Sequence, residues 1–301
     1  MIVSELAQQL VNGLAIGCMY ALIGLGYTLI FGVMRLIFFA QGELCMVGAI
    51  AALGAARLAN DQLPGGTPMI LLIALAAAVV ASAATGVLAE RLAIWPIRRA
   101  ARTKQLIASL GISLILQNLV LLRVSAESMP FPPLLADSRF VIGTATVTSA
   151  QLSIILGSIV LMSLLQWLLR ATRIGLRIRA VAEDSETAEL DGIDVRRTVM
   201  ATFAIGSALA GLAGVMMGCY DGVAKYNMGF LPGIKGFTAA ILGGFGQPRG
   251  AMIGGLALGL AETLAAGYIS STYKDLIAFG ILVLVILVRP SGLLGGGLAR
   301  T

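Results

Sequence analysis

Long apolar runs dominate this chain of 301 residues. A helix that crosses a bilayer needs about 20 largely apolar residues, because the hydrocarbon core is about 30 Å thick and a helix rises about 1.5 Å per residue. Each run that approaches this length predicts a spanning helix. The runs cover residues 10–34, 44–58, 69–92, 106–124, 150–169, 199–219, 250–269 and 276–288. The sequence therefore predicts an all-α, polytopic transmembrane helix bundle of about eight spans.

The scarcity of charged residues supports the same fold class. Only 12% of the residues are charged, whereas soluble domains carry roughly 25%. The mean hydropathy is +0.94, so much of the exterior must face a lipid bilayer rather than water. The 37 glycines fit this interpretation, since small residues let membrane helices approach one another closely. We expect one transmembrane domain over residues 1–301.

Two basic loops predict the orientation of the bundle. One follows the third apolar run, and the other follows the fifth. Cytoplasmic loops of membrane proteins carry an excess of Lys and Arg, so both loops should face the cytoplasm. Counting spans back from them places the N-terminus outside, and Arg289 and Arg300 favour a cytoplasmic C-terminus. The basic residues of the two loops are Arg91, Arg98, Arg99, Arg102, Lys104, Arg170, Arg173, Arg177, Arg179, Arg196 and Arg197.

A shorter apolar segment near residues 236–246 is too short to span a bilayer comfortably. It predicts a half-helix or a re-entrant segment, which is tolerated only where protein or a water-filled cavity surrounds it. A similar glycine-containing break separates the first two apolar runs. Paired interrupted segments in two halves of a chain indicate an inverted repeat around a central pathway. Glycine-mediated helix packing explains the pattern equally well.

The most charged part of the chain is the loop over residues 170–198. Within it, Asp184 or Ser185 can cap the start of a short helix, and Gly192 can end it. Such a capped, charged helix at the cytoplasmic face predicts a docking element. The alternative is a solvated loop whose arginines only set the topology.

Residue types that the chain lacks exclude several kinds of chemistry. There is no histidine, which is the usual general base and the commonest zinc ligand. Cys18, Cys45 and Cys219 lie in apolar stretches, so we expect no disulfide and no metal site. No lysine follows a glycine, and the phosphate-binding loop of an ATPase is therefore missing. The net charge of +6 comes from topology-setting loops and does not indicate binding to nucleic acid.

Several motifs in order resemble the permeases of branched-chain amino acid ABC transporters, most closely the LivH-type subunit. The resemblance spans nearly the whole chain. It rests on Asn12-Gly13-Leu14, Tyr20-Ala21-Leu22-Ile23, Phe31-Gly32-Val33, Phe39-Ala40-Gln41-Gly42-Glu43, residues 174–184, Ala188, Leu190, Gly192-Ile193, residues 202–214, residues 242–246, Gly250-Ala251 and residues 289–295. One departure is Gln41, where the related pattern has His. Glutamine keeps a hydrogen-bonding group but cannot titrate, which argues against a proton-linked role.

The resemblance implies that the chain lies in the bacterial inner membrane and works with a set of partners. They are a second, similar permease subunit, two cytoplasmic ATP-binding subunits that use ATP-Mg, and a periplasmic substrate-binding protein. This chain itself would hold no cofactor and would not be an enzyme. The resemblance implies that a short helix couples this chain to the ATP-binding subunits. Its residues are Ala182, Glu183, Asp184, Ser185, Glu186, Ala188, Glu189, Leu190 and Gly192.

Polar groups within apolar spans are costly, and they tend to face a cavity or one another. This rule selects candidate pathway residues: Asn12, Tyr20, Gln41, Glu43, Gln117, Asn118 and Glu262, with Gly243, Gly244 and Gly246 as possible backbone lining. For Glu43 the alternative is a structural cap on the second helix. For Glu262 the alternative is a hydrogen bond between helices. For the glycines it is close packing.

Two other functions compete with an ABC permease. A self-sufficient secondary transporter or channel would need ion-coupling carboxylates near the middle of the membrane, and Glu262 is the one plausible candidate. A membrane enzyme is poorly supported, because no nucleophile motif or metal cluster is present. The sequence leaves the substrate open among branched-chain amino acids, other amino acids, urea and amides.

Overall fold

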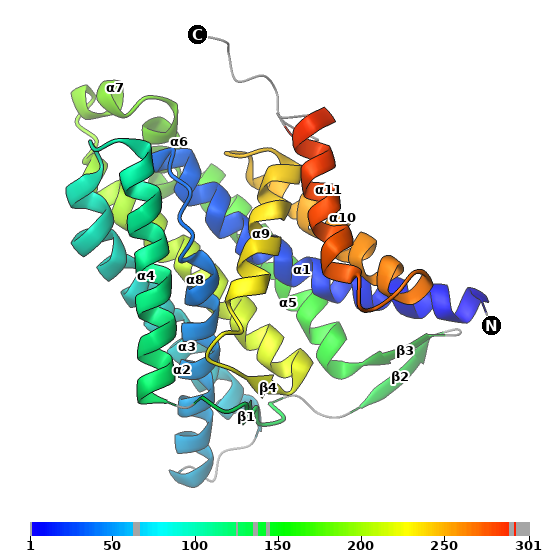
Figure 1. Ribbon diagram of the computed structural model, residues 1–301. Helices are drawn as coiled ribbons and strands as arrows, with labels where there is room; N and C mark the ends of the chain where they lie inside the picture. The colour runs from blue at the N-terminus through cyan, green and yellow to red at the C-terminus, as the bar shows by residue number, and fades with distance from the viewer. Residues whose placement is uncertain are drawn as a thin grey trace.

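The computed structural model describes residues 2–62, 67–124, 126–134, 138–142, 145–288 and 292, which fold into a bundle of helices (Figure 1). Its helices are α1 Ile2–Met34, α2 Gln41–Gln62, α3 Thr67–Ala89, α4 Arg102–Arg123, α5 Ser149–Ala171, α6 Arg173–Glu183, α7 Ser185–Leu190, α8 Val195–Asp221, α9 Phe230–Gly243, α10 Pro248–Tyr268 and α11 Lys274–Val288. A wider π-helical turn, Glu90–Ile94, and a 3-10 turn, Trp95–Ile97, prolong α3. The short strands are β1 Met129–Pro130, β2 Arg139–Ile142, β3 Ala145–Thr148 and β4 Val223–Ala224.

Within the described residues, seven helical segments are long and apolar enough to cross a bilayer. They correspond to the first seven predicted spans, and they confirm an all-α polytopic membrane protein. The eighth predicted span is α11, which has 15 residues and is shorter than the roughly 20 that a full crossing needs. The predicted signals at Arg289 and Arg300 lie outside the described residues.

The predicted short helix is present as α9, with 14 residues. It begins at Phe230 rather than near residue 236, and Lys235 is buried inside the helix. Beyond Gly243, the chain turns through Gly244 and Gly246, whose φ angles of 100° and 82° favour glycine. An inverted repeat stays a prediction.

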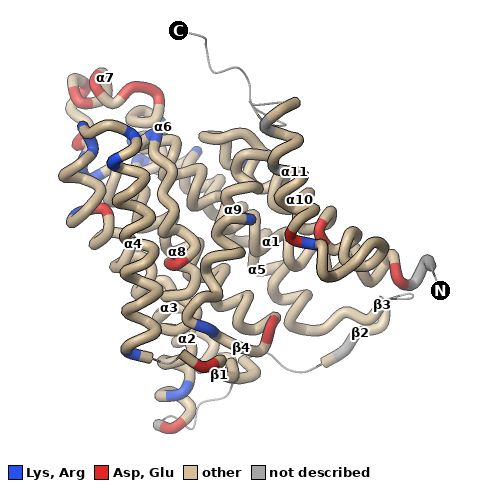
Figure 2. The backbone as a smooth tube through the Cα atoms, in the orientation of Figure 1, with Lys and Arg blue, Asp and Glu red and all other residues tan. Residues whose placement is uncertain are grey.

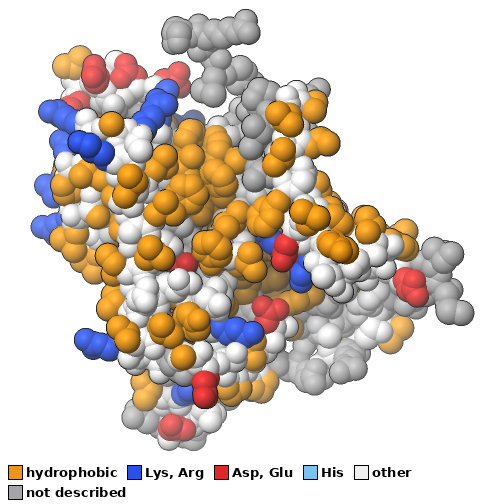
Figure 3. Space-filling view, viewed as in Figure 1, with side chains coloured by type: hydrophobic (Ala, Val, Ile, Leu, Met, Phe, Trp, Pro, Cys, Tyr) orange, Lys and Arg blue, Asp and Glu red, His pale blue; other side chains and the backbone are white. Residues whose placement is uncertain are grey.

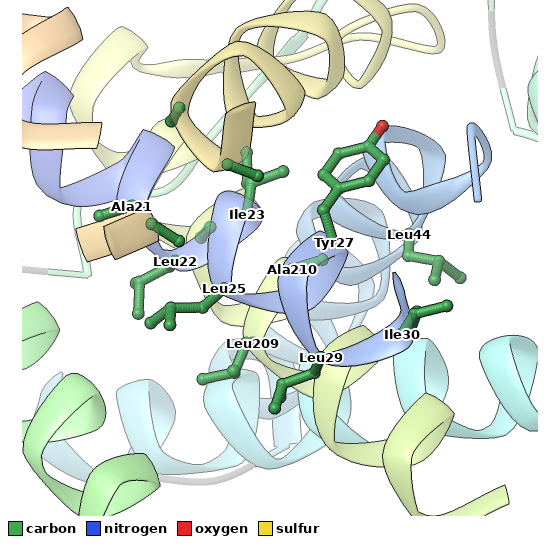
Figure 4. Close-up of a cluster of buried hydrophobic side chains, with 14 of the residues drawn as sticks. Ala21, Leu22, Ile23, Leu25, Tyr27, Leu29, Ile30, Leu44, Leu209 and Ala210 are labelled. Carbon is green, nitrogen blue, oxygen red and sulfur yellow. The ribbon is translucent and has the colours of Figure 1, made fainter. Parts of the chain in front are cut away.

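Helix α1 forms the centre of the bundle. In its most apolar stretch 83% of the residues are buried, whereas the figure for α4 is 11%. Figure 4 shows why: side chains project from α1 in several directions, with Tyr27 on one side and Leu22, Leu25 and Leu29 on others. A helix that is apolar on all sides belongs in an interior, while α4 exposes leucines and isoleucines along its length.

Glycines set the spacing between the central helices. A Cβ on Gly17 would collide with the backbone of α10 near Leu256, and one on Gly259 would collide with Gly17. The same close approach joins Gly48 of α2 to Gly211 of α8. These contacts are van der Waals packing of small residues, the usual means of helix association in lipid.

The two basic loops meet at one end of the bundle. Trp95 follows α3, and its ring stacks against Arg98, with 4.0 Å from the guanidinium carbon to the ring centre. Arg196, in the first turn of α8, lies 5.7 Å from the same ring. Figure 2 colours the backbone blue at Lys and Arg positions, and these positions gather at this end, near α6, which we call the basic face. At the other end β1 pairs with β4, joining the loop after α4 to the end of α8.

A buried ion-pair cluster holds the C-terminal helices together. Lys235 of α9 has only 4% of its surface exposed. Its Nζ lies 2.7 Å from Glu262 Oε1 of α10 and 2.6 Å from Asp275 Oδ1 of α11. It also lies 5.6 Å from the ring centre of Tyr20 on α1. One lysine thus contacts three neighbouring helices in a region where an unpaired charge would be expensive.

Replacement of Lys235 should show how far the stability of the protein depends on this cluster. We expect Lys235→Met to lower the free energy of unfolding by about 3–5 kcal/mol, because Glu262 would stay buried without a cation. The double variant Lys235→Met with Glu262→Met should regain most of that loss. Thermal melting of the detergent-purified protein measures both.

The control is Lys225→Met, which removes an exposed lysine and should shift stability by less than about 0.5 kcal/mol. If the single and double variants melted at the same temperature, the ion pair would not be the source of the effect.

Candidate functional site

The break between α1 and α2 is held by a side chain of α4 and by a backbone carbonyl of α8. Arg35, directly after α1, has a φ of 51°, which turns the chain out of the helix. The backbone N–H of Phe39 donates to Ser109 Oγ of α4 at 3.4 Å. Gln41 Nε2 donates to the carbonyl oxygen of Gly206 on α8 at 2.8 Å. The polar group at Gln41 therefore anchors the start of α2, and its Oε1 atom has no hydrogen-bond partner.

Glu43 lies in the first turn of α2 and is almost completely buried, with 1% exposure. Ser113 Oγ of α4 donates to Glu43 Oε1 at 3.3 Å, and Oε2 has no partner. A carboxylate at this position interacts favourably with the positive end of the helix. One residue earlier, Gly42 packs directly against the backbone of α9 at Gly229. The start of α2 and the short helix α9 are therefore in contact at this point.

A chain of aromatic rings, which the sequence analysis missed, joins the two breaks. Phe237 of α9 lies at its centre, with ring-centre distances of 5.7 Å to Tyr27 and 5.9 Å to Phe39. Phe245 continues the chain at 5.5 Å from Phe237 and 4.4 Å from Phe31. Phe39 belongs to the first break and Phe245 to the second. The sequence signal that could have predicted this contact was the presence of an aromatic residue in each of the two glycine-containing breaks.

We call these five rings the aromatic chain: Tyr27, Phe31, Phe39, Phe237 and Phe245. All except Tyr27 are partly exposed, so the chain reaches the surface. In Figure 3, orange apolar side chains cover the middle of the face on which Figure 1 shows α9 between α4 and α11. This arrangement offers an apolar surface next to the buried polar groups of Gln41 and Glu43.

The other candidate pathway residues lie elsewhere. Tyr20 and Glu262 belong to the Lys235 cluster. The contact from Lys235 to Glu262 joins two helices, as in the alternative interpretation of Glu262. Asn12 Oδ1 accepts from Gln151 Nε2 of α5 at 2.8 Å. Asn118 is exposed on α4 and donates to the Leu114 carbonyl oxygen at 2.8 Å, while Gln117 is half-buried. These residues do not converge on one site.

The glycines of the second break divide into two groups. Gly243 packs against the backbone of Gly250, where any side chain would collide, so it joins α9 closely to α10. Gly244 and Gly246 supply the turn through their positive φ angles. Gly246 is exposed, and no atom lies within 4 Å of where its Cβ would be. Of the three, Gly246 is therefore the one with backbone open to a solute.

The short helix at the basic face has the predicted cap, but it is α7, Ser185–Leu190, and Ala182 and Glu183 of the predicted coupling helix belong to α6. Asp184 caps α7, with its Oδ1 accepting from the backbone N–H of Glu186 at 2.9 Å and of Thr187 at 3.4 Å. Thr187 Oγ1 donates to Asp184 Oδ2 at 2.7 Å. This side-chain bond, with the backbone bonds, lowers the pKa of the Asp184 carboxyl below its ordinary value of 3.8. The cap is intact above that ordinary value and is lost only as the pH falls through the lowered pKa.

The two faces of α7 differ sharply in exposure. Ala188 is buried against the rest of the protein, at 3% exposed, whereas Leu190 is 87% exposed. After the helix, Gly192 has a φ of 81°, which lets the backbone reverse toward α8. A hollow of 570 Å³ lies between α7 and the segment around Trp95, and its lining includes Glu186, Glu189 and Arg196. Helix α7 therefore presents an exposed leucine and also contributes Glu186 and Glu189 to the lining of the hollow.

All three cysteines are free thiols. Over the described ranges, no group of His, Cys, Asp or Glu is arranged to hold a metal ion.

Comparison with known proteins relates this architecture to a family. Residues 9–286 match the family described as the permease component of the branched-chain amino acid transport system. The high-affinity branched-chain amino acid transport system permease protein BraD of Pseudomonas aeruginosa is 41% identical over 293 residues, covering 96% of this chain and 95% of BraD. The corresponding LivH protein of Escherichia coli K12 is 40% identical over 294 residues, with the same coverage.

More distant similarity extends to another substrate class. The fructose import permease protein FruG of Bifidobacterium longum is 26% identical over 268 residues, covering 83% of this chain and 75% of FruG. No solved structure matches the chain significantly. The family match covers most of the chain, and BraD and LivH are each at least 40% identical to it over nearly their full lengths. The chain belongs to the family of permease components of branched-chain amino acid transport systems.

Proposed function

We propose that the chain is the permease subunit of an ATP-driven importer in the bacterial inner membrane. With a second, similar permease subunit it forms the translocation pathway for branched-chain or related amino acids. Two cytoplasmic subunits bind and hydrolyse ATP-Mg, and a periplasmic binding protein delivers the substrate. The observation that carries this proposal is α7, a capped helix held by Ala188 that presents Leu190 at the basic face. The names of BraD and LivH support the substrate class.

The proposed cycle uses the two helix breaks as the moving parts. Movement of the ATP-binding subunits pulls on α7, and α7 is continuous through Gly192 with α8. Helix α8 holds the start of α2 through the bond from Gln41 to Gly206. Alternating access requires differential contacts in two states. The aromatic chain supplies contacts that can separate when α1 and α9 move apart.

A self-sufficient secondary transporter is the second candidate, and the ion pair from Lys235 to Glu262 argues against Glu262 as its ion-coupling carboxylate. That mechanism needs a carboxylate in the membrane that is free to bind a coupling ion. Glu262 was the candidate, but Lys235 already lies 2.7 Å from its Oε1 atom.

Reconstitution tests the proposed function directly. The permease, its partner permease and the ATP-binding subunits are placed in proteoliposomes with the binding protein, and uptake of radiolabelled leucine is measured with ATP-Mg. Uptake should require ATP and every subunit. Leucine transport by this chain alone, driven by an ion gradient, would establish the secondary transporter instead.

Substitutions in α7 should separate ATP hydrolysis from transport. Gly192→Val forces a β-branched residue into a positive φ, which should displace the end of α7. We expect uptake to fall roughly tenfold while ATP hydrolysis by the assembled complex continues. Reversal of the charges at Glu186 and Glu189 should act in the same direction, because these residues line the hollow beside α7.

Asp191→Ser is the matched control, because it changes an exposed residue one position away and should leave uptake unchanged. If Gly192→Val and the charge reversal also transported normally, α7 would not be the coupling element.

Glu43 offers a test of the pathway. Glu43→Gln keeps the size of the side chain and its bond from Ser113 but removes the charge. If Glu43 contributes to the pathway, the maximal uptake rate should fall roughly tenfold with an unchanged melting temperature. If Glu43 is a structural cap, the melting temperature should fall instead, and uptake should follow protein abundance. Ser113→Ala, which removes only the donor, serves as the control.

A further inference from the structure

A second feature of the basic face is a cavity on which three arginines converge. It has a volume of 380 Å³ and lies between α1, α5, α6 and α10. Arg170 comes from the end of α5, Arg179 from α6 and Arg249 from the start of α10. The lining of this cavity and that of the hollow beside α7 share no arginine. The cavity therefore has its own set of arginines, although Val33 lines both spaces and Ala182, of the predicted coupling segment, lines the cavity.

The three positive charges are not neutralised by the protein. The lining of the cavity contains no Asp or Glu. The ion pairs of the described residues involve Arg197 and Lys235 and none of these three arginines. Arg249 Nε donates to Gln166 Oε1 at 3.3 Å, which is a neutral acceptor. The site accordingly carries excess positive charge that attracts an anion.

The start of α10 adds to the same field. This helix of 21 residues begins with Pro248, and its N-cap residue Gln247 makes no side-chain cap bond. Gln247 and Pro248 both line the cavity. The N–H groups of the first turn therefore lack a capping side chain, and the positive end of the helix dipole points to the place where the arginines meet. This combination is a general design for binding phosphate.

The remaining walls indicate what the anion is attached to. They are apolar side chains that lie within the spanning segments, including Leu29 and Val33 of α1 and Leu169 of α5. Next to Gln166 on α5, Trp167 is 60% exposed, as is typical of aromatic side chains at a membrane interface. A free phosphate ion needs no apolar wall, and an acidic protein loop would have to enter the membrane to reach this depth. A phospholipid meets both requirements.

We propose that this cavity binds an anionic phospholipid, with the phosphate headgroup on Arg170, Arg179 and Arg249 and the start of an acyl chain along α1 and α5. Basic pockets between transmembrane helices bind anionic headgroups in this way. The site is independent of the transported substrate. It ties the end of α5, α6 and the second helix break, through Gly246, to the lipid composition of the membrane.

The binding of phosphatidylglycerol to the purified permease tests the proposal. The protein is delipidated, placed in phosphatidylcholine nanodiscs doped with phosphatidylglycerol, and examined for retained lipid by native mass spectrometry. The triple variant Arg170→Gln, Arg179→Gln, Arg249→Gln should retain roughly tenfold less phosphatidylglycerol than the native chain. The matched control replaces three exposed arginines that do not line the cavity, Arg102, Arg173 and Arg177, with glutamine. This control should retain phosphatidylglycerol as the native chain does.

A steric variant keeps the charges and removes the space. A Cβ at Gly32 would meet only the Gly246 Cα at 4.0 Å, so Gly32→Leu can be accommodated and fills the cavity. It should also retain less phosphatidylglycerol, with an unchanged melting temperature. Equal retention by the native chain and the triple variant would overturn the proposal.

Two other results would overturn it in favour of a different ligand. If inorganic phosphate displaced the lipid from the native chain, and Gly32→Leu bound phosphatidylglycerol normally, the site would serve a free anion. If the triple variant kept its lipid but lost binding of the ATP-binding subunits, the arginines would serve a protein partner.

Discussion

Backbone hydrogen bonding in lipid is the constraint on which this structure depends. A spanning chain must satisfy its own N–H and C=O groups, so it can leave the helix only where other protein covers it. The breaks after α1 and after α9 meet this condition in different ways. At the first break, Ser109 accepts from the Phe39 backbone N–H, and Gln41 donates to the Gly206 carbonyl of α8. At the second break, Gly243 packs directly against α10. Because both breaks adjoin α1, the most buried helix, the irregular backbone is concentrated at the centre of the bundle.

Two kinds of contact then hold the helices at different strengths. Glycine contacts such as Gly17 with Gly259 join α1 to α10 by van der Waals packing along much of their length. Helix α11, in contrast, is tied to the bundle by the ion pair from Asp275 to Lys235. Helix α4 has little buried surface, and its polar links are the serines that contact the first break and Glu43. A change at Glu43 would therefore be transmitted to α4 more readily than to α10.

The spans and the capped helix could be predicted from the sequence because each depends on local pattern. Apolar length defines a spanning segment, and Asp184 and Gly192 mark α7 by cap chemistry alone. The Lys235 cluster could not be predicted, since a lysine beside an apolar run indicates a boundary unless its partners are known. Those partners, Glu262 and Asp275, come from two other helices. The aromatic chain was missed for the same reason, because Phe39 and Phe245 meet at Phe237 only through tertiary packing.

The arginines of the basic face do more than set the orientation of the chain in the membrane. A loop that only set topology would place its arginines in water without order. Here Arg98 and Arg196 stack on Trp95 and hold the segment beside α7, whereas Arg170, Arg179 and Arg249 surround a cavity with apolar walls. The first group needs a neighbouring aromatic ring, and the second leaves its charge open to an outside anion. Because α6 lines the cavity and leads directly into α7, a ligand in the cavity would be placed to act on the position of α7, and so on the surface where we propose that an ATP-driven motion enters the permease.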